Sequence, residues 1–283
     1  MSYLSIVVAG SNYGYGGDFI GRFQAWMDNI FNLFPRIGVD ADITIVEWAP
    51  PLDRPRMKDV LNWKRKSIPV KIIEAPKHLA DSLPNPHKVS FWEFQAKNIG
   101  IRRATGHFIL SANPDNIYSP ALVYRLRDLK EDCFYRTNHH DTRDGRVFQI
   151  HCATASIVNG RPNGCAGFVK PDANGKFQYP PPLGYIEPLH FNKSGDFLAM
   201  SRENWHQIHG HPETTYCVTV DGETVYLAAA HGLKQIIFEE PSYHLDHGRD
   251  QRHCPYWDDA KPHGNKNGDG WGYSGVDFAS TII

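Results

Sequence analysis

A single carboxylate, Asp115, stands where an apolar run of the sequence ends. The run is Phe108-Ile109-Leu110, and Asn113-Pro114-Asp115 follows it. A strand that leads into a turn has this pattern. So has a strand that delivers a carboxylate to the carboxyl edge of a sheet, where open α/β folds bind ligands. In that second case, Asp115 has the right chemistry for a hard cation such as Mg²⁺ or Mn²⁺.

Several other common sites are disfavoured by their spacing. The stretch GSNYGYGGDF places Phe19 where the G-x-G-x-x-G motif needs its last glycine, and no G-x-x-x-x-G-K-[ST] motif occurs. The histidines at 206–211 lack the cysteine or carboxylate pattern of a zinc site, and the group at 139–141 is a weaker candidate still. The five cysteines are widely spaced and argue against a disulfide framework.

The composition excludes two classes of partner. The 283 residues carry 30 basic and 31 acidic side chains, and no run of Lys and Arg predicts nucleic-acid binding. No apolar segment reaches the length of about 18 residues that a transmembrane helix needs. The N-terminus lacks the features of a signal peptide, so we expect a cytoplasmic protein.

The elements that would carry Asp115 to a sheet edge alternate along the first 120 residues. Short apolar runs predict strands at 5–9, 43–46, 69–75 and 107–110. Helical spacing of apolar residues predicts a helix over 19–34, and further helices are expected at 56–66 and 90–104. Alternating strands and helices with short connections predict an α/β domain with a parallel sheet.

The pattern loosens in the second half of the chain. Residues 160–190 are rich in Gly, Pro and Asn and predict a long loop. A helix is expected at 221–231, before Gly232, and a strand at 234–240. The polar, Gly-rich and aromatic residues 251–283 are expected to form a C-terminal tail or lid.

The stretch EFQAKNIGIRRATGHFILSANPD resembles the segment that leads to the metal-binding Asp-x-Asp of GT-A glycosyltransferases, especially the family-2-like enzymes. The matching elements keep their order: Lys97-Asn98-Ile99-Gly100, Ala104-Thr105-Gly106, the apolar strand, and Asn113-Pro114-Asp115 in place of Asp-x-Asp. The resemblance implies a GT-A, Rossmann-like single domain over residues 1–250, with a mixed, mostly parallel central sheet. Residues 1–120 would form its nucleotide-binding half and residues 121–250 its acceptor-binding half.

The resemblance also implies which residues contact a nucleotide-diphospho-sugar donor, with a UDP-sugar favoured. They lie on the first strand and its loop, at the end of the second strand, on the Lys-Asn helix and in the segment beneath the sugar. In this sequence they are Ala9, Ser11, Asn12, Glu47, Lys97, Asn98, Arg102, Asn113 and Asp196. Asn113 offers a neutral amide where the family has a carboxylate, and Glu47 is alternatively an ordinary carboxylate at a strand end.

The last matching segments imply a metal centre and a catalytic base. PSYHLDHG resembles the family's C-terminal His element, so His247 or His244 is expected to join Asp115 in binding Mn²⁺ or Mg²⁺. VDGETVYLAAAHG resembles the family's Glu-Asp helix, with Asp221 eleven residues before its glycine at the position of the base. Glu223 is the other candidate for the catalytic base. The alternatives are ordinary surface histidines, and an N-cap role for Asp221.

The resemblance therefore implies metal-dependent, inverting transfer of a sugar to a hydroxyl of a glycan acceptor. Two alternatives stay open. A sugar-1-phosphate nucleotidyltransferase also uses a Rossmann-like sheet and a metal, but it needs Arg and Lys close behind the first strand, where this sequence supplies only Arg22. A non-catalytic carbohydrate-binding protein is indicated by the single Asp of the Asn-Pro-Asp motif.

Overall fold

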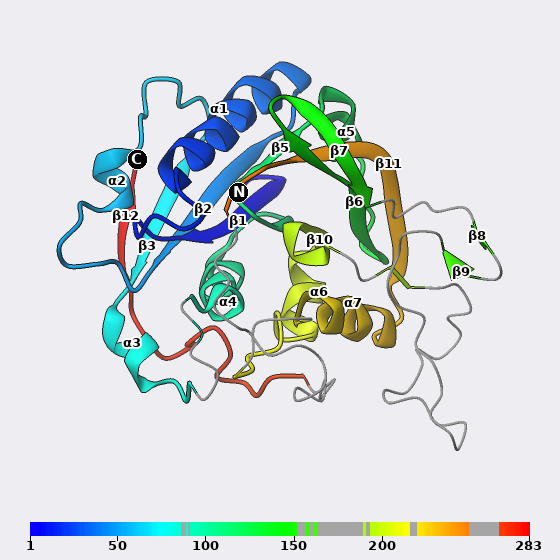
Figure 1. The fold of residues 1–283 in the computed structure, drawn as a ribbon. Coiled ribbons are helices and arrows are strands. Elements are labelled where there is room, and N and C mark those ends of the chain that lie inside the picture. The colour runs from blue at the N-terminus through cyan, green and yellow to red at the C-terminus, as the bar shows by residue number, and fades with distance from the viewer. Residues whose placement is uncertain are drawn as a thin grey trace.

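The computed structural model describes residues 1–85, 89, 91–151, 157–158, 161–162, 189–190, 193–215, 220–248 and 266–283. Nearly all of the predicted loop at 160–190 lies outside these residues. Within them, ten strands form one sheet in the order β12-β3-β2-β1-β4-β10-β6-β11-β5, with β7 paired to β6 (Figure 1). The predicted α/β class with a mixed central sheet is confirmed.

Four parallel strands form the part of the sheet that the sequence predicts. They are β1 (Leu4–Gly10), β2 (Ala41–Trp48), β3 (Val70–Ala75) and β4 (Phe108–Ala112). Every side chain of β1 and β4 is buried, as expected for parallel strands covered on both faces. The carboxyl ends of these four strands lie at one edge of the sheet. Asp115 follows β4 at this edge.

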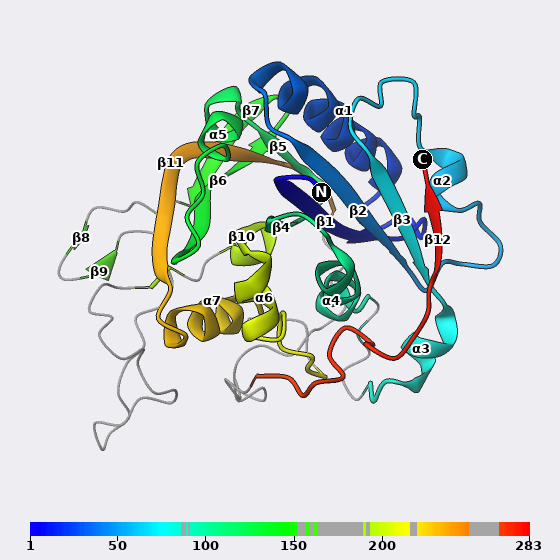
Figure 2. The same ribbon diagram turned by 180° about the vertical axis from the view of Figure 1, so that it is seen from behind.

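Helices cover both faces of the sheet (Figures 1 and 2). On one face lie α1 (Phe19–Ile37) and α5 (Pro120–Arg125); on the other lie α4 (Glu93–Arg103), α6 (Arg202–Gln207) and α7 (Val220–Ala230). Gly100 explains how α4 lies so close to the sheet, because a Cβ there would sit 2.5 Å from Val7 Cγ1. The glycine inside the predicted helix is therefore a packing requirement.

The second half of the sheet is mixed, and the sequence predicts only one of its strands. β10 (Phe197–Ser201) lies antiparallel between β4 and β6 (Cys133–Arg143), and β6 forms a hairpin with β7 (Arg146–His151). β11 (Lys234–Leu245) runs parallel to β6 and antiparallel to β5 (Asn116–Tyr118). β8 (Ile157–Val158) and β9 (Arg161–Pro162) pair separately.

One predicted helix is much shorter in the structure. The helix expected at 56–66 is only α2 (Met57–Val60), and the chain is already extended at Leu61. The side chain of Asn62 accepts a hydrogen bond from Lys64 N, a local turn that competes with helix formation. A further short helix, α3 (Lys77–Ser82), was not predicted.

The C-terminal residues 266–283 pass α4 and end in β12 (Ala279–Ile282), which pairs antiparallel with β3 at the sheet edge (Figure 2). Arg103 fastens them by donating hydrogen bonds to the carbonyls of Gly272, Tyr273 and Val276. This end of the chain therefore belongs to the sheet rather than to a free tail, while the boundary at residue 250 stays a prediction. Within the described part of the chain, no helix combines the length and hydropathy that crossing a bilayer requires.

Candidate functional site

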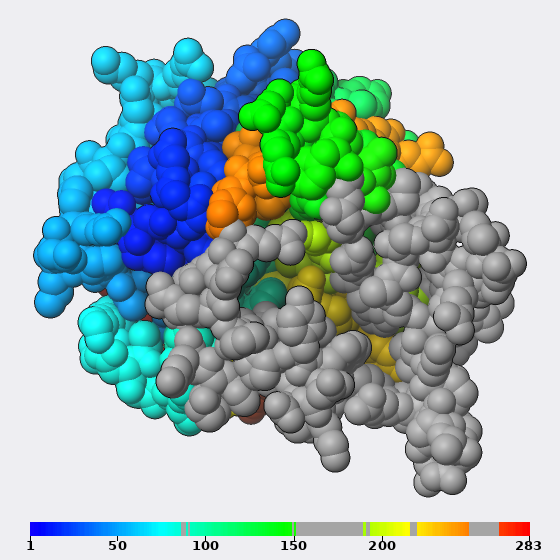
Figure 3. All heavy atoms as spheres, in the orientation of Figure 1, coloured from blue at the N-terminus to red at the C-terminus, as the bar shows by residue number. Residues whose placement is uncertain are grey.

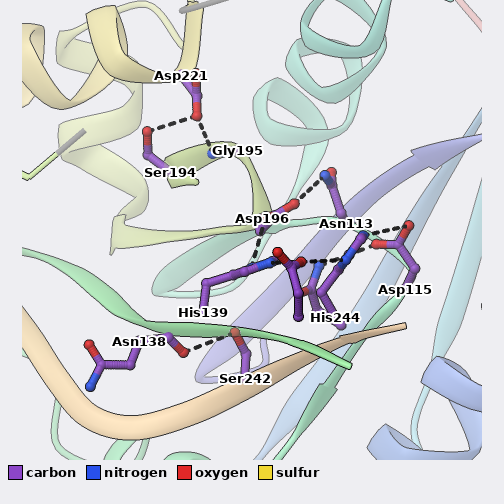
Figure 4. A network of polar contacts seen from close by, with 12 residues as sticks. Asn113, Asp115, Asn138, His139, Ser194, Gly195, Asp196, Asp221, Ser242 and His244 are labelled. Atoms are coloured by element: carbon purple, nitrogen blue, oxygen red, sulfur yellow. Dashed lines mark hydrogen bonds and ion pairs between the residues drawn. The ribbon is translucent and has the colours of Figure 1, made fainter. Parts of the chain in front are cut away.

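The register of three strands brings the predicted metal ligands together. On β11, His244 pairs with Asp141 of β6 on one side and with Asn116 of β5 on the other. Asp115 immediately precedes β5, and its carbonyl accepts a hydrogen bond from Leu245 N at 2.9 Å. Asp115 and the end of β11 therefore meet because the sheet aligns them (Figure 4).

Asp115, His244 and His247 form a group whose ligand atoms all lie within 4.8 Å of one another. Asp115 Oδ2 lies 3.3 Å from His247 Nε2 and 3.8 Å from His244 Nε2. The other carboxylate oxygen accepts a hydrogen bond from Asn116 Nδ2 at 3.2 Å. One carboxylate oxygen and two imidazole nitrogens that face one point are a donor set that fits Mn²⁺.

Both imidazoles are held through the nitrogen that does not face Asp115. His244 Nδ1 lies 2.9 Å from Asp141 Oδ1, and His247 Nδ1 lies 3.0 Å from the carbonyl oxygen of Gly248. A ring that donates from Nδ1 presents Nε2 as a metal ligand. The hydrogen bond with Asp115 raises the pKa of His247, whereas burial lowers the pKa of His244 in spite of the same carboxylate.

The loop between β1 and α1 lies against this group. The rings of Tyr15 and His247 pack edge to face with centroids 5.2 Å apart. A Cβ on Gly16 would lie 2.5 Å from His247 Nδ1. Arg22 holds the loop by donating hydrogen bonds to the carbonyls of Tyr15 and Gly16. Figure 3 shows the end of β11, in orange, between the blue N-terminal region and the green β6–β7 hairpin.

A chain of buried polar contacts connects the metal-ligand group to the turn before β10 (Figure 4). His139 Nε2 lies 2.9 Å from Asp141 Oδ1, and His139 Nδ1 lies 3.0 Å from Asp196 Oδ2. Asp196 ends the short 3₁₀ helix η1 (Ser194–Asp196) and accepts a hydrogen bond from Asn113 Nδ2 at 2.7 Å. The contacts link the ends of β4, β6, β10 and β11.

The charges in this chain of contacts alternate in sign. Burial alone raises the pKa of Asp196, but the charge and hydrogen bond of His139, together with the charges of Lys193 and His244, outweigh it and hold this pKa well below its ordinary value. Burial alone lowers the pKa of His139, but Asp196 and Asp141 outweigh it and raise this pKa. An imidazole with a carboxylate at each nitrogen is the arrangement of an imidazolium cation.

Lys97 and Asn113 contact each other beneath the site. The Lys97 side chain is fully buried, and its Nζ donates hydrogen bonds to Glu93 Oε1, Asn113 Oδ1 and the carbonyl of Gly195 at 2.6, 2.6 and 2.8 Å. These contacts use all three donors of the ammonium group. In this arrangement Lys97 positions its neighbours. The amide oxygen of Asn113 already accepts the hydrogen bond from Lys97.

Asp221 reaches the same turn from α7. Its Oδ2 accepts hydrogen bonds from Ser194 Oγ at 2.9 Å and from Gly195 N at 2.8 Å (Figure 4). Glu223 lies two residues further, about 200° around the helix, and is buried with 4% of its surface exposed. The structure therefore brings Asp221 to η1, whereas Glu223 lies on another side of α7.

Two further residues of α4 fasten neighbouring segments. Asn98 donates hydrogen bonds to the carbonyl of His211 and to Glu213 Oε1, and it accepts one from His211 N. Arg102 donates to the carbonyl of Trp271 and stacks its guanidinium 4.9 Å from the centroid of that ring. The structure does not bring either residue to the metal-ligand group.

The remaining predicted donor contacts gather at the carboxyl end of β1. Ala9 is buried among apolar side chains, and Asn12 donates a hydrogen bond to the carbonyl of Pro55. Ser11 is 1% exposed, and its hydroxyl has no hydrogen-bond partner among the described residues. A buried hydroxyl in this position fits a site for a polar ligand, because buried polar groups are normally paired.

Glu47 lies at the neighbouring end of β2 and is 1% exposed. Its Oε1 accepts a hydrogen bond from Met57 N at 2.9 Å, at the start of α2. Burial raises the pKa of Glu47 to about 7, although the hydrogen bond opposes this. Glu47 thus has a structural contact, and its contact with a base or ribose stays a prediction.

Sequence reasoning set His139 and Asp141 aside as a weak zinc candidate, and it missed a third polar residue of the site, Glu93. His139 and Asp141 alternate along β6 and therefore face the same side, a signal that is readable once β6 is known to be a strand. Glu93 and Lys97 stand four residues apart on one helix, the spacing of an ion pair. Burial raises the pKa of Glu93, although the charge of Lys97 opposes this.

No family model matches this chain, and no curated protein matches it in sequence. Among solved structures, the catalytic domain of Drosophila β1,4-galactosyltransferase 7, in complex with xylobiose, is similar with a TM-score of 0.48 and 12% identity, over 95% of this chain and 82% of that one. The mannosyltransferase PcManGT from Pyrobaculum calidifontis, in complex with GDP-Man and Mn²⁺, has a TM-score of 0.48 and 14% identity, over 88% and 58%. Residues 1–349 of S. aureus TarS give 0.49 and 12%, over 87% and 60%.

The chain thus covers less than two thirds of the length of two of these structures. At TM-scores below 0.5, all three similarities are too distant to assign an activity to it.

Proposed function

We propose that this chain is a metal-dependent glycosyltransferase that moves a sugar from a nucleotide-diphospho-sugar to a hydroxyl of a glycan acceptor. The observation that carries the proposal is the convergence of Asp115, His244 and His247 beside the loop that follows β1. In open α/β sheets, ligands bind at this carboxyl edge of the strands. The sequence resemblance to GT-A enzymes supports the same assignment.

Asp115, His244 and His247 would hold Mn²⁺ or Mg²⁺ in a shell that the donor's phosphate oxygens complete. When bound, such a cation stabilises the negative charge that collects on the leaving diphosphate. Ser11, at the end of β1, and Glu47, at the end of β2, lie where a nucleoside would cross the same edge. A UDP-sugar is the donor that we favour.

Asp221 is the residue that we assign to the acceptor's proton. Ser194 Oγ and Gly195 N donate hydrogen bonds to its Oδ2, which fixes the orientation of the carboxylate. Oδ1 then takes the proton of the acceptor hydroxyl as the hydroxyl oxygen bonds to the sugar carbon and the bond from that carbon to the diphosphate breaks. General-base catalysis of this kind typically contributes about 10²–10⁴-fold in rate. Attack on the face opposite the leaving group gives inversion.

The two alternative functions are less well supported. A nucleotidyltransferase needs a free cation in the loop after the first strand, and Arg22 is engaged there with the carbonyls of Tyr15 and Gly16. A non-catalytic protein was indicated by Asn113 in place of Asp. Because this amide bridges Lys97 and Asp196, it has a defined role and is no sign of a lost site.

The test is turnover of UDP-, GDP-, dTDP- and CMP-sugars by the purified chain, with and without Mn²⁺. We expect one donor to release its nucleotide in a Mn²⁺-dependent way, and Asp115→Asn to abolish this release. The control is Asp246→Asn, which removes a carboxylate that pairs with Arg143 at 2.7 Å. This variant should still release the nucleotide. Pyrophosphate formed from a nucleoside triphosphate and a sugar 1-phosphate would indicate a nucleotidyltransferase. Thermal stabilisation by sugars without turnover would indicate a binding protein.

A further inference from the structure

His244 and His247 differ in what holds their rings. His247 Nδ1 faces the carbonyl of the next residue, whereas His244 Nδ1 faces a carboxylate from another strand, Asp141 Oδ1, at 2.9 Å. The sheet fixes this contact, because His244 and Asp141 are direct partners in the register of β6 and β11. The side chain of Asp141 is only 3% exposed, so water does not compete for its oxygen.

Further contacts hold both partners in place. Asp141 Oδ1 also lies 2.9 Å from His139 Nε2, and Thr142 Oγ1 donates a hydrogen bond to the carbonyl of His244 at 2.8 Å. Rotation of the Asp141 carboxylate or of the His244 ring would therefore break a buried polar contact, which is costly. A carboxylate that accepts the Nδ1–H of a histidine leaves the lone pair on Nε2.

We infer that Asp141 is a positioning residue for the proposed metal centre: it holds His244 with Nδ1 protonated and Nε2 directed at the point that Asp115 Oδ2 faces. The inference rests on the proposed function in that it requires the metal centre. It also explains how the chain functions with one carboxylate in its Asn-Pro-Asp motif. The second negative charge is supplied by Asp141 and acts on the cation through the imidazole of His244.

Calorimetric titration with Mn²⁺ alone tests this role in the wild-type protein, Asp141→Asn and Asp246→Asn. Both variants lose one carboxylate near the same histidines, but Asp246 is exposed and its carboxylate pairs with Arg143, whereas Asp141 is buried against His244 Nδ1. Loss of an outer-shell carboxylate costs about 10–100-fold in metal affinity, so Asp141→Asn should bind Mn²⁺ at least about 10-fold more weakly. Asp246→Asn should stay within about 3-fold, because solvent and salt screen an exposed charge.

Equal affinities of Asp141→Asn and Asp246→Asn would overturn the role of Asp141, whereas a wild-type protein that binds no Mn²⁺ would contradict the metal centre itself. A second Mn²⁺ ion per chain that is lost in Asp141→Asn would also overturn it. Asp141 would then be a direct ligand in the group His139, Asp141 and His244, whose ligand atoms also lie within 4.8 Å.

Nitrogen NMR of His244 in the metal-free wild-type protein at pH 8 gives a second readout that requires no variant to fold. The proton is expected on Nδ1. A proton on Nε2, with Nδ1 bare, would contradict the inference.

Discussion

Asn113 donates its amide N–H to Asp196 Oδ1 at 2.7 Å, while its own amide oxygen accepts from Lys97 at 2.6 Å. A carboxylate at this position has no N–H to donate, so the amide alone fits both neighbours. Asparagine in place of the first Asp of the family's motif is therefore a bridge between the Lys97 cation and the Asp196 carboxylate.

Restoring that aspartate should harm the protein. Asn113→Asp would place a second carboxylate against Asp196, and we expect it to lower the free energy of unfolding by about 1–3 kcal/mol, the cost of a lost buried partner. It should not tighten Mn²⁺ binding. Urea unfolding and calorimetry measure both quantities, with the exposed Asn32→Asp as the control for added charge. Tighter Mn²⁺ binding at unchanged stability would show that Asn113 is an impaired ligand.

Alanine variants of two adjacent glycines, compared with each other, distinguish the effect of contact with the metal site from the effect of backbone strain. Gly16 and Gly17 have φ of +62° and +91°, so alanine is strained at either position. A Cβ on Gly16 would lie 2.5 Å from His247 Nδ1, whereas at Gly17 nothing lies within 4 Å. We expect Gly16→Ala to weaken Mn²⁺ affinity and Gly17→Ala to cost stability alone. Equal Mn²⁺ affinities of the two variants would show that this loop does not influence metal binding.

Glu47 should make stability depend on pH. Its pKa is raised from 4.5 to about 7 by burial, so the folded protein keeps a proton that the unfolded chain has lost between these values. Stability therefore falls as the pH rises from 4.5 to 7, by up to about 3 kcal/mol, and the loss is complete above pH 7. Glu47→Gln keeps the acceptor for Met57 N and cannot ionise. It should match the wild type at pH 5 and exceed its melting temperature at pH 8.5; parallel pH profiles would refute the assignment.

The sequence predicts the parallel strands and the main helices well, because the spacing of apolar residues in those segments matches the period of a strand or of a helix. The strands β6 and β7 were missed because much of their sequence is polar: β6 reads CFYRTNHHDTR, yet most of its residues are buried. β5 and β10 are only three and five residues long, and so short a run shows no clear period. The polar sequence of β6 also hid the fact that His139 and Asp141 lie on one face of a strand. Asp115 and the C-terminal histidines were linked only through family resemblance, since the register of β5, β6 and β11 that joins them is a long-range property.

Asp221 and Glu223 are distinguished by measuring donor affinity and transfer in each variant. Asp221→Asn should keep donor affinity and lose transfer by at least about 10²-fold, because the acceptor's proton has no base. Glu223→Gln should retain transfer, since Glu223 is buried and lies about 200° around α7 from Asp221, which contacts η1. If Glu223→Gln were inactive and Asp221→Asn active, the base would lie two residues further along α7.

The central claim is that Asp115, His244 and His247 bind the cation that holds the donor's diphosphate. Anomalous diffraction at the manganese edge, from crystals grown with Mn²⁺ and UDP, tests it most directly. We predict one Mn²⁺ ion bound by Asp115 Oδ2 and by Nε2 of both His247 and His244, at about 2.0–2.3 Å by analogy with zinc–imidazole bonds. A nucleotide-bound Mn²⁺ ion with neither imidazole within that distance would contradict the claim.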